Sequence, residues 1–100
     1  MNIFVDTGAW IALADENDIK HNAAKKIYDL LKKKNVSLII TDYIFDETTT
    51  WLHYKVGHVI ACDWGNKILD SHMVNMILWH RITKAFNILW CERSENFSYF

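Results

Sequence analysis

The chain contains no proline, only three glycines and only two cysteines among its 100 residues. Without a Pro- or Ser-rich stretch no linker is indicated, so we expect one compact domain over residues 1–100. Cys62 and Cys91 are too few for a disulfide framework. No stretch approaches the roughly 20 apolar residues that cross a bilayer, and the start lacks the basic leader of a signal peptide. These features predict a soluble, cytoplasmic protein that does not use a membrane.

The chain also lacks an excess of either sign of charge, because 11 basic and 12 acidic side chains give a formal net charge of −1. The balance therefore does not require nucleic acid or an anionic membrane as a partner. One local basic patch is present and comprises Lys25, Lys26, Lys32, Lys33 and Lys34. A solvated helix face explains these lysines, and we favour that interpretation over an RNA-binding patch.

Hydrophobic residues make up 51% of the sequence and alternate between short apolar runs and helical stripes. The runs at 2–5, 37–41 and 73–78 predict buried strands. Helices are expected over 9–14, 21–34, 42–55, 58–70 and 82–89. The order βααβααβα is typical of βαβ units. It predicts an α/β fold, a small parallel sheet of about three strands flanked by helices in an incomplete three-layer α/β/α arrangement, since a sheet with helices on both faces normally has more strands.

Two acids stand at unusual positions in this pattern. Asp6 directly follows the first apolar run, where it is either a cap for the next helix or a metal ligand. Glu47 falls with Ile44 and Trp51 on the stripe of the helix over 42–55, so we expect it to face inward. The alternative is that Glu47 lies at the exposed margin of that stripe. Asp46, about 100° further round the helix, is expected to face solvent.

Asp6 and Glu47 both follow strands that are expected to be parallel. Because parallel strands end at the same edge of a sheet, the two carboxylates can meet there. Converging carboxylates repel one another unless a hard cation lies between them, and Mg²⁺ and Mn²⁺ prefer oxygen ligands. The sequence therefore predicts an acidic metal site at this edge.

The segment Val5-Asp6-Thr7-Gly8-Ala9, followed by a short apolar helix, resembles the opening of PIN-domain proteins, the fold of the VapC-type toxin ribonucleases. Residues 40–48 resemble that family's second motif, in which a glutamate follows the second strand. The resemblance implies an endoribonuclease that depends on Mg²⁺ or Mn²⁺. It also implies that Asp6 and Glu47 are catalytic metal ligands, and that Thr7 supports the metal or its water. An antitoxin partner and a homodimer are implied as well.

The sequence departs from the family pattern near its C-terminus. The family places a third acid after a Ser-Phe-like lead-in, which residues 97–100 resemble at the point where the sequence ends. We therefore expect a PIN-like domain without the usual C-terminal helix and strands, and with weakened activity. Glu92 and Glu95 precede the expected position, and we do not expect them to substitute. The alternative is a non-catalytic interaction module or an inactive fragment.

Two further expectations concern surfaces. Absence of the last elements would leave the first strand as an exposed edge, which predicts a dimer or a poorly soluble protein. The aromatics at core positions are expected to pack in the interior rather than to stack on bases, and they are Trp51, Trp64, Trp79 and Trp90. Trp10 lies beside Asp6 in the sequence, so for this residue both packing and a place at the rim of the site stay open.

Overall fold

A computed structural model describes residues 1–77 and confirms the predicted alternation of strands and helices over that range. The strands are β1 (Asn2–Phe4), β2 (Ser37–Thr41) and β3 (Val74–Ile77). The helices are α1 (Thr7–Ala14), α2 (His21–Lys33), α3 (Asp42–Lys55) and α4 (His58–Asp70). The predictions made for the helix over 82–89, for Trp79 and Trp90 and for Glu92 and Glu95 lie outside the described residues.

The three strands form a parallel sheet in the order β1-β2-β3. Asn2 pairs with Ser37 in β1 and β2, and Leu38 pairs with Val74 in β2 and β3. The backbone N–H of Val5 donates to the carbonyl of Ile39 at 3.1 Å, so the pairing continues to the residue before Asp6. The carboxyl ends of β1 and β2 therefore lie side by side, at the same edge of the sheet.

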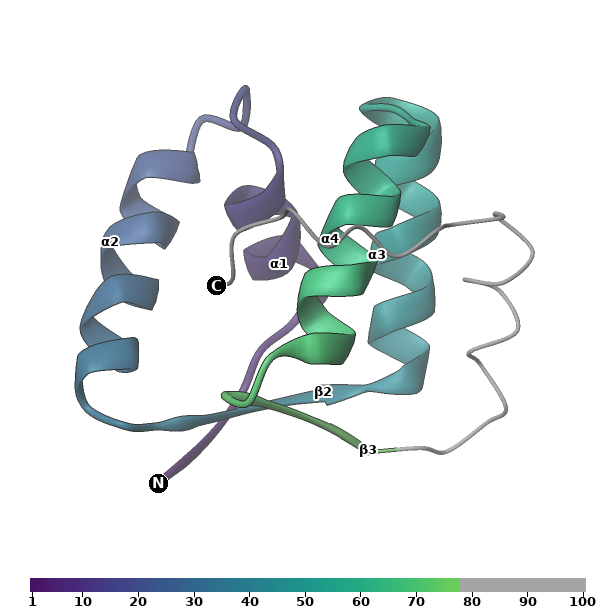
Figure 1. The fold of residues 1–100 in the computed structure, drawn as a ribbon. Coiled ribbons are helices and arrows are strands. Elements are labelled where there is room, and N and C mark those ends of the chain that lie inside the picture. The colour runs from purple at the N-terminus through teal and green to yellow at the C-terminus, as the bar shows by residue number, and fades with distance from the viewer. Residues whose placement is uncertain (78–100) are drawn as a thin grey trace.

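The described helices lie on the same side of the sheet (Figure 1). In β2 the buried Leu38 and Ile40 alternate with the half-buried Ser37 and Ile39. Helix α1 packs against α2 and α3, and α3 packs against α4. Residues 1–77 therefore form two layers, and the helical layer expected on the other face is not found within them.

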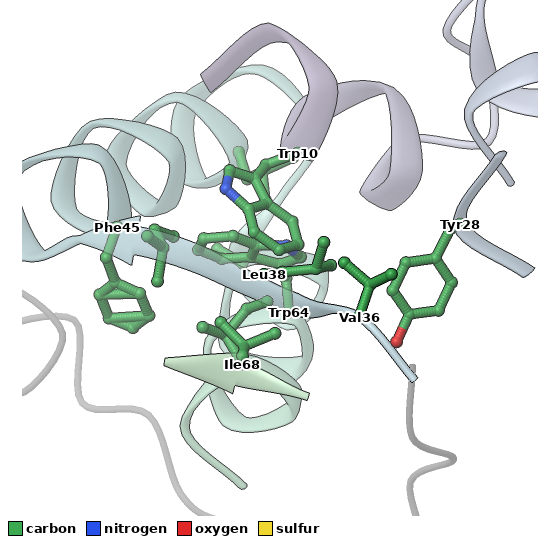
Figure 2. Close-up of a cluster of buried hydrophobic side chains, with 11 residues drawn as sticks. Trp10, Tyr28, Val36, Leu38, Phe45, Trp64 and Ile68 are labelled. Carbon is green, nitrogen blue, oxygen red and sulfur yellow. The ribbon is translucent and has the colours of Figure 1, made fainter. Parts of the chain in front are cut away.

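An aromatic cluster occupies the centre of the core (Figure 2). Trp10 and Trp64 contact each other edge to face, with ring centroids 6.0 Å apart, and Phe45 stacks on Trp64 at 5.3 Å. The prediction that Trp64 is a core residue is confirmed. Trp10 is fully buried, so it packs in the core and does not form the rim of the site.

The ends of the helices follow local chemistry. Thr41 caps α3, because its Oγ1 accepts a hydrogen bond from the N–H of Ile44 at 3.1 Å. Asn35, with φ +57°, lies just beyond α2, and Gly57, with φ +144°, lies between α3 and α4. No helix within residues 1–77 is long and apolar enough to cross a membrane.

Candidate active site

Asp6 occupies the junction between β1 and α1. Its backbone is extended, with φ −84° and ψ 172°, and its Oδ1 accepts a hydrogen bond from the N–H of Ala9 at 3.0 Å. Asp6 is therefore the N-cap of α1, one of the two roles that the sequence left open. The side chain is exposed, and an ionised carboxylate has about four acceptor positions. One capping bond thus leaves Asp6 the capacity to bind a cation as well.

Thr7 and Glu47 connect the two acidic motifs. Thr7 is the first residue of α1, and its Oγ1 donates a hydrogen bond to Oε1 of Glu47 in the second turn of α3, at 2.5 Å. Two residues forty positions apart in the chain are thereby brought together, with Asp6 next to Thr7 in sequence.

The burial predicted for Glu47 is wrong. The buried residues of α3 are Asp42, Phe45, Thr48, Thr49 and Leu52. The inward face is thus turned by about one residue, or 100°, from the predicted stripe. Glu47 is exposed, and Trp51, also predicted to be a core residue, is 36% exposed. Glu47 lies at the exposed margin, where solvent and a bound molecule can reach it.

Asp46 also differs from the prediction, because it is half-buried and its Oδ1 is inaccessible to solvent. Burial raises the pKa of Asp46 above its ordinary value, and the negative charge of Asp42 raises it further. Asp42 is fully buried in the first turn of α3, where the helix dipole favours a carboxylate. A helical period begun at Asp42 rather than at Ile44 would have identified both as inward-facing acids.

The described residues supply a small set of oxygen ligands. Within residues 1–77, no group of three or more His, Cys, Asp or Glu side chains is arranged to hold a metal ion. The candidate site therefore consists of two exposed carboxylates, Asp6 and Glu47, and the hydroxyl of Thr7. All three follow strand ends at one edge of a parallel sheet, which is where ligands bind in open α/β folds.

Two hollows in the described part of the surface can be compared with the candidate site, and they lie in different places. The larger, of about 530 Å³, is lined by residues of α2 and α4, including Tyr28 and Trp64, and does not include the candidate site. The smaller, of about 490 Å³, runs along α3 and includes Glu47. The hollow that bears on the site is therefore the smaller one.

The sequence of this chain is similar to those of two curated proteins. No family model matches the sequence. The 23S rRNA-specific endonuclease VapC20 of Mycobacterium tuberculosis, from strains CDC 1551 and H37Rv, is 34% identical over 59 residues. The alignment covers 59% of this chain and 43% of each relative, so the chain spans less than half the length of the curated relatives it matches.

The crystal structure of Mycobacterium tuberculosis VapC20, described as a Sarcin-Ricin loop cleaving toxin, superposes with a TM-score of 0.67 at 26% identity. The match covers 98% of this chain and 72% of that chain. Sequence similarity and the α/β fold agree with the resemblance that the two acidic motifs carry. The chain is therefore similar in sequence and in fold to a VapC-type toxin.

Proposed function

We propose that this protein is an endoribonuclease that depends on a divalent metal ion, with Asp6 and Glu47 as ligands of Mg²⁺ or Mn²⁺. The observation that carries the proposal is the hydrogen bond from Thr7 to Glu47, which joins the two acidic motifs at the sheet edge. The names of the relatives support it, since VapC20 is an endonuclease that acts on 23S rRNA. RNA is accordingly the proposed substrate.

The donor set fits the proposed cation. Asp6, Thr7 and Glu47 offer only oxygen atoms, which hard cations prefer over the nitrogen and sulfur ligands of zinc sites. Mg²⁺ is commonly held by one or two carboxylates together with water and substrate phosphates, so two acids are sufficient to bind it. When bound, such an ion would supply an activated water and would stabilise negative charge on the scissile phosphate.

The side chains of the site have distinct tasks in this mechanism. Thr7 restricts the rotamers of Glu47 by donating to Oε1, so the carboxylate is already ordered before the ion binds. The N–H of Ala9 holds Oδ1 of Asp6 in the same way. Because both carboxylates are exposed, a phosphodiester can approach them from solvent. Asp6 and Glu47 would thus bind, and Thr7 would orient.

A partner protein and a second copy are part of the proposal. Toxins of this type pair with an antitoxin, and on this basis we infer an antitoxin and a homodimer for this chain. The uncovered side of β1 supports self-association, because β1 pairs only with β2 in the part of the sheet that is described.

The decisive experiment separates the two roles of Asp6. Asp6→Asn keeps the cap, because asparagine caps helices as well as aspartate does, but it removes the charge. Asp6→Ala removes both. Cleavage of a structured RNA in Mn²⁺ should be lost in both variants, whereas the melting temperature should fall only in Asp6→Ala. Equal cleavage by the wild type and Asp6→Asn would defeat the assignment.

The second candidate is a non-catalytic interaction module with the same fold. It is favoured by the absence of a three-acid cluster within residues 1–77. A thermal melt with increasing Mn²⁺ separates the candidates. The nuclease should be stabilised as the ion concentration rises, and Glu47→Gln should abolish that stabilisation. An interaction module should melt at the same temperature at every Mn²⁺ concentration.

A further inference from the structure

One side of α3 exposes a row of aromatic side chains in line with Glu47. Tyr43 is 59% exposed, Trp51 36% and Tyr54 78%. Tyr43, Glu47, Trp51 and Tyr54 are separated by four, four and three residues, a spacing that places them on one face of a helix. The exposure of Trp51 overturns the sequence-based expectation that this residue packs in the interior.

The same face is hollowed. Tyr43, Glu47, Thr50, Trp51, Tyr54 and Lys55 contribute to the lining of the 490 Å³ hollow described above. Its lining combines aromatic side chains, a hydroxyl and a lysine with the carboxylates of Asp46 and Glu47. Along the helix axis, Trp51 lies about 6 Å and Tyr54 about 10 Å beyond Glu47.

We propose that Trp51 and Tyr54 form a stacking subsite for unpaired nucleobases of the RNA strand whose phosphate lies at Asp6 and Glu47. The inference rests on the proposed function and deepens it, because it names the form of RNA that is bound. Aromatic side chains bind single strands by stacking on base faces, largely without regard to sequence. Lys55 lies at the far end of the hollow, where it can contact a phosphate of the same strand.

The lining favours a nucleic acid over a second copy of this chain. The core of a protein–protein interface is depleted of charged residues. This hollow instead carries Asp46 and Glu47 at one end and Lys55 at the other. A bound strand can leave these charges hydrated or paired with phosphate and cation, because only the bases need contact with the rings.

The test measures binding without cleavage. Fluorescence anisotropy gives the affinity of the full chain for a labelled, unstructured RNA of about 10 nucleotides, within the range that single-strand sites span. Divalent ions are omitted, so the result does not depend on nuclease activity. We expect Trp51→Ala and Tyr54→Ala each to weaken binding about tenfold. Trp51→Phe, which keeps an aromatic face, should restore most of the affinity.

Two controls make the result specific. An abasic oligonucleotide of equal length should bind the wild type and Trp51→Ala equally, because it offers no base to stack. Ile27→Ala, at an exposed apolar residue on α2, should leave the affinity for normal RNA unchanged. Melting temperatures establish that each variant is folded.

Two outcomes would overturn the inference. One is that Trp51→Ala binds the normal RNA as tightly as the wild type does. The other is that Trp51→Ala converts a dimer into a monomer in sedimentation velocity, since the face would then belong to a second copy. A failure of the stacking subsite leaves unaffected the cleavage assay on the Asp6 variants and the Mn²⁺ melt on Glu47→Gln, so the two proposals fail separately.

Discussion

The hydroxyl of Thr7 links α1 to α3 through a single hydrogen bond to Glu47. Side chains that orient metal ligands commonly change metal affinity or activity about 10- to 100-fold when they are removed. We predict a loss of this size in Thr7→Val, which keeps the shape of the side chain, and little loss in Thr7→Ser. Cleavage rate and Mn²⁺ affinity by calorimetry are the measurements. A Thr7→Val protein with wild-type values for both would show that the bond has no part in the site.

Asp46 gives the protein a pH dependence with a definite sign. Because burial and the charge of Asp42 raise its pKa in the folded state, the folded protein binds this proton more tightly than the unfolded chain does. Ionisation of Asp46 therefore lowers the stability as the pH rises from the ordinary value of 3.8 through the raised pKa.

Asp46→Asn removes that penalty. The variant should be more stable than the wild type in urea at pH 7, and the difference should shrink as the pH falls through the raised pKa toward 3.8. Glu16→Gln, which removes one negative charge at an exposed position after α1, should show a smaller effect at pH 7. If the stability advantage of Asp46→Asn over the wild type grew as the pH fell, the sign would be opposite to the one predicted.

At the scale of the element, the sequence predicts where α3 begins and ends but not which way it faces. Thr41 and Gly57 supply the local signals for its ends, and the structure confirms them. Its rotation could not be predicted, because the residues from Thr48 to Thr50 carry almost no hydrophobic contrast. Two of these threonines are buried and the third is exposed, and packing against α1 and α4 decides which.

The buried threonines of α3 allow a matched comparison. Thr49 Oγ1 donates to the carbonyl of Phe45 at 2.7 Å, whereas Thr48 Oγ1 is buried and has no hydrogen-bond partner among the described residues. An unsatisfied buried hydroxyl costs roughly 1–3 kcal/mol. Thr48→Val should therefore raise the free energy of unfolding by about 1 kcal/mol. Thr49→Val, which removes a satisfied hydroxyl, should not stabilise the protein, and chemical denaturation compares the two directly. A loss of stability in Thr48→Val would indicate that its hydroxyl has a favourable contact.

At the scale of the molecule, most of what the sequence predicts about the site follows from the order of the strands and helices. The alternation of strands and helices predicts parallel strands, and parallel strands bring Asp6 and the helix that carries Glu47 to one edge. The number of layers could not be read in this way, because a half-buried strand such as β2 has apolar residues on both faces. The bond between Thr7 and Glu47 also required coordinates, since no sequence pattern specifies a contact across forty residues.

The last prediction concerns the side of β1 that does not pair with β2. In the described part of the chain β1 pairs only with β2, and Phe4 of β1 is 57% exposed. An open apolar edge favours pairing with a second chain, and a lysine placed on such an edge opposes it. Phe4→Lys should therefore shift the protein from dimer toward monomer in sedimentation velocity. Ile27→Lys, at a residue that is 59% exposed on α2, introduces the same side chain away from the edge and should leave the dimer intact. A wild-type protein that sediments as a monomer at high concentration would contradict the prediction, because the edge would then need no partner.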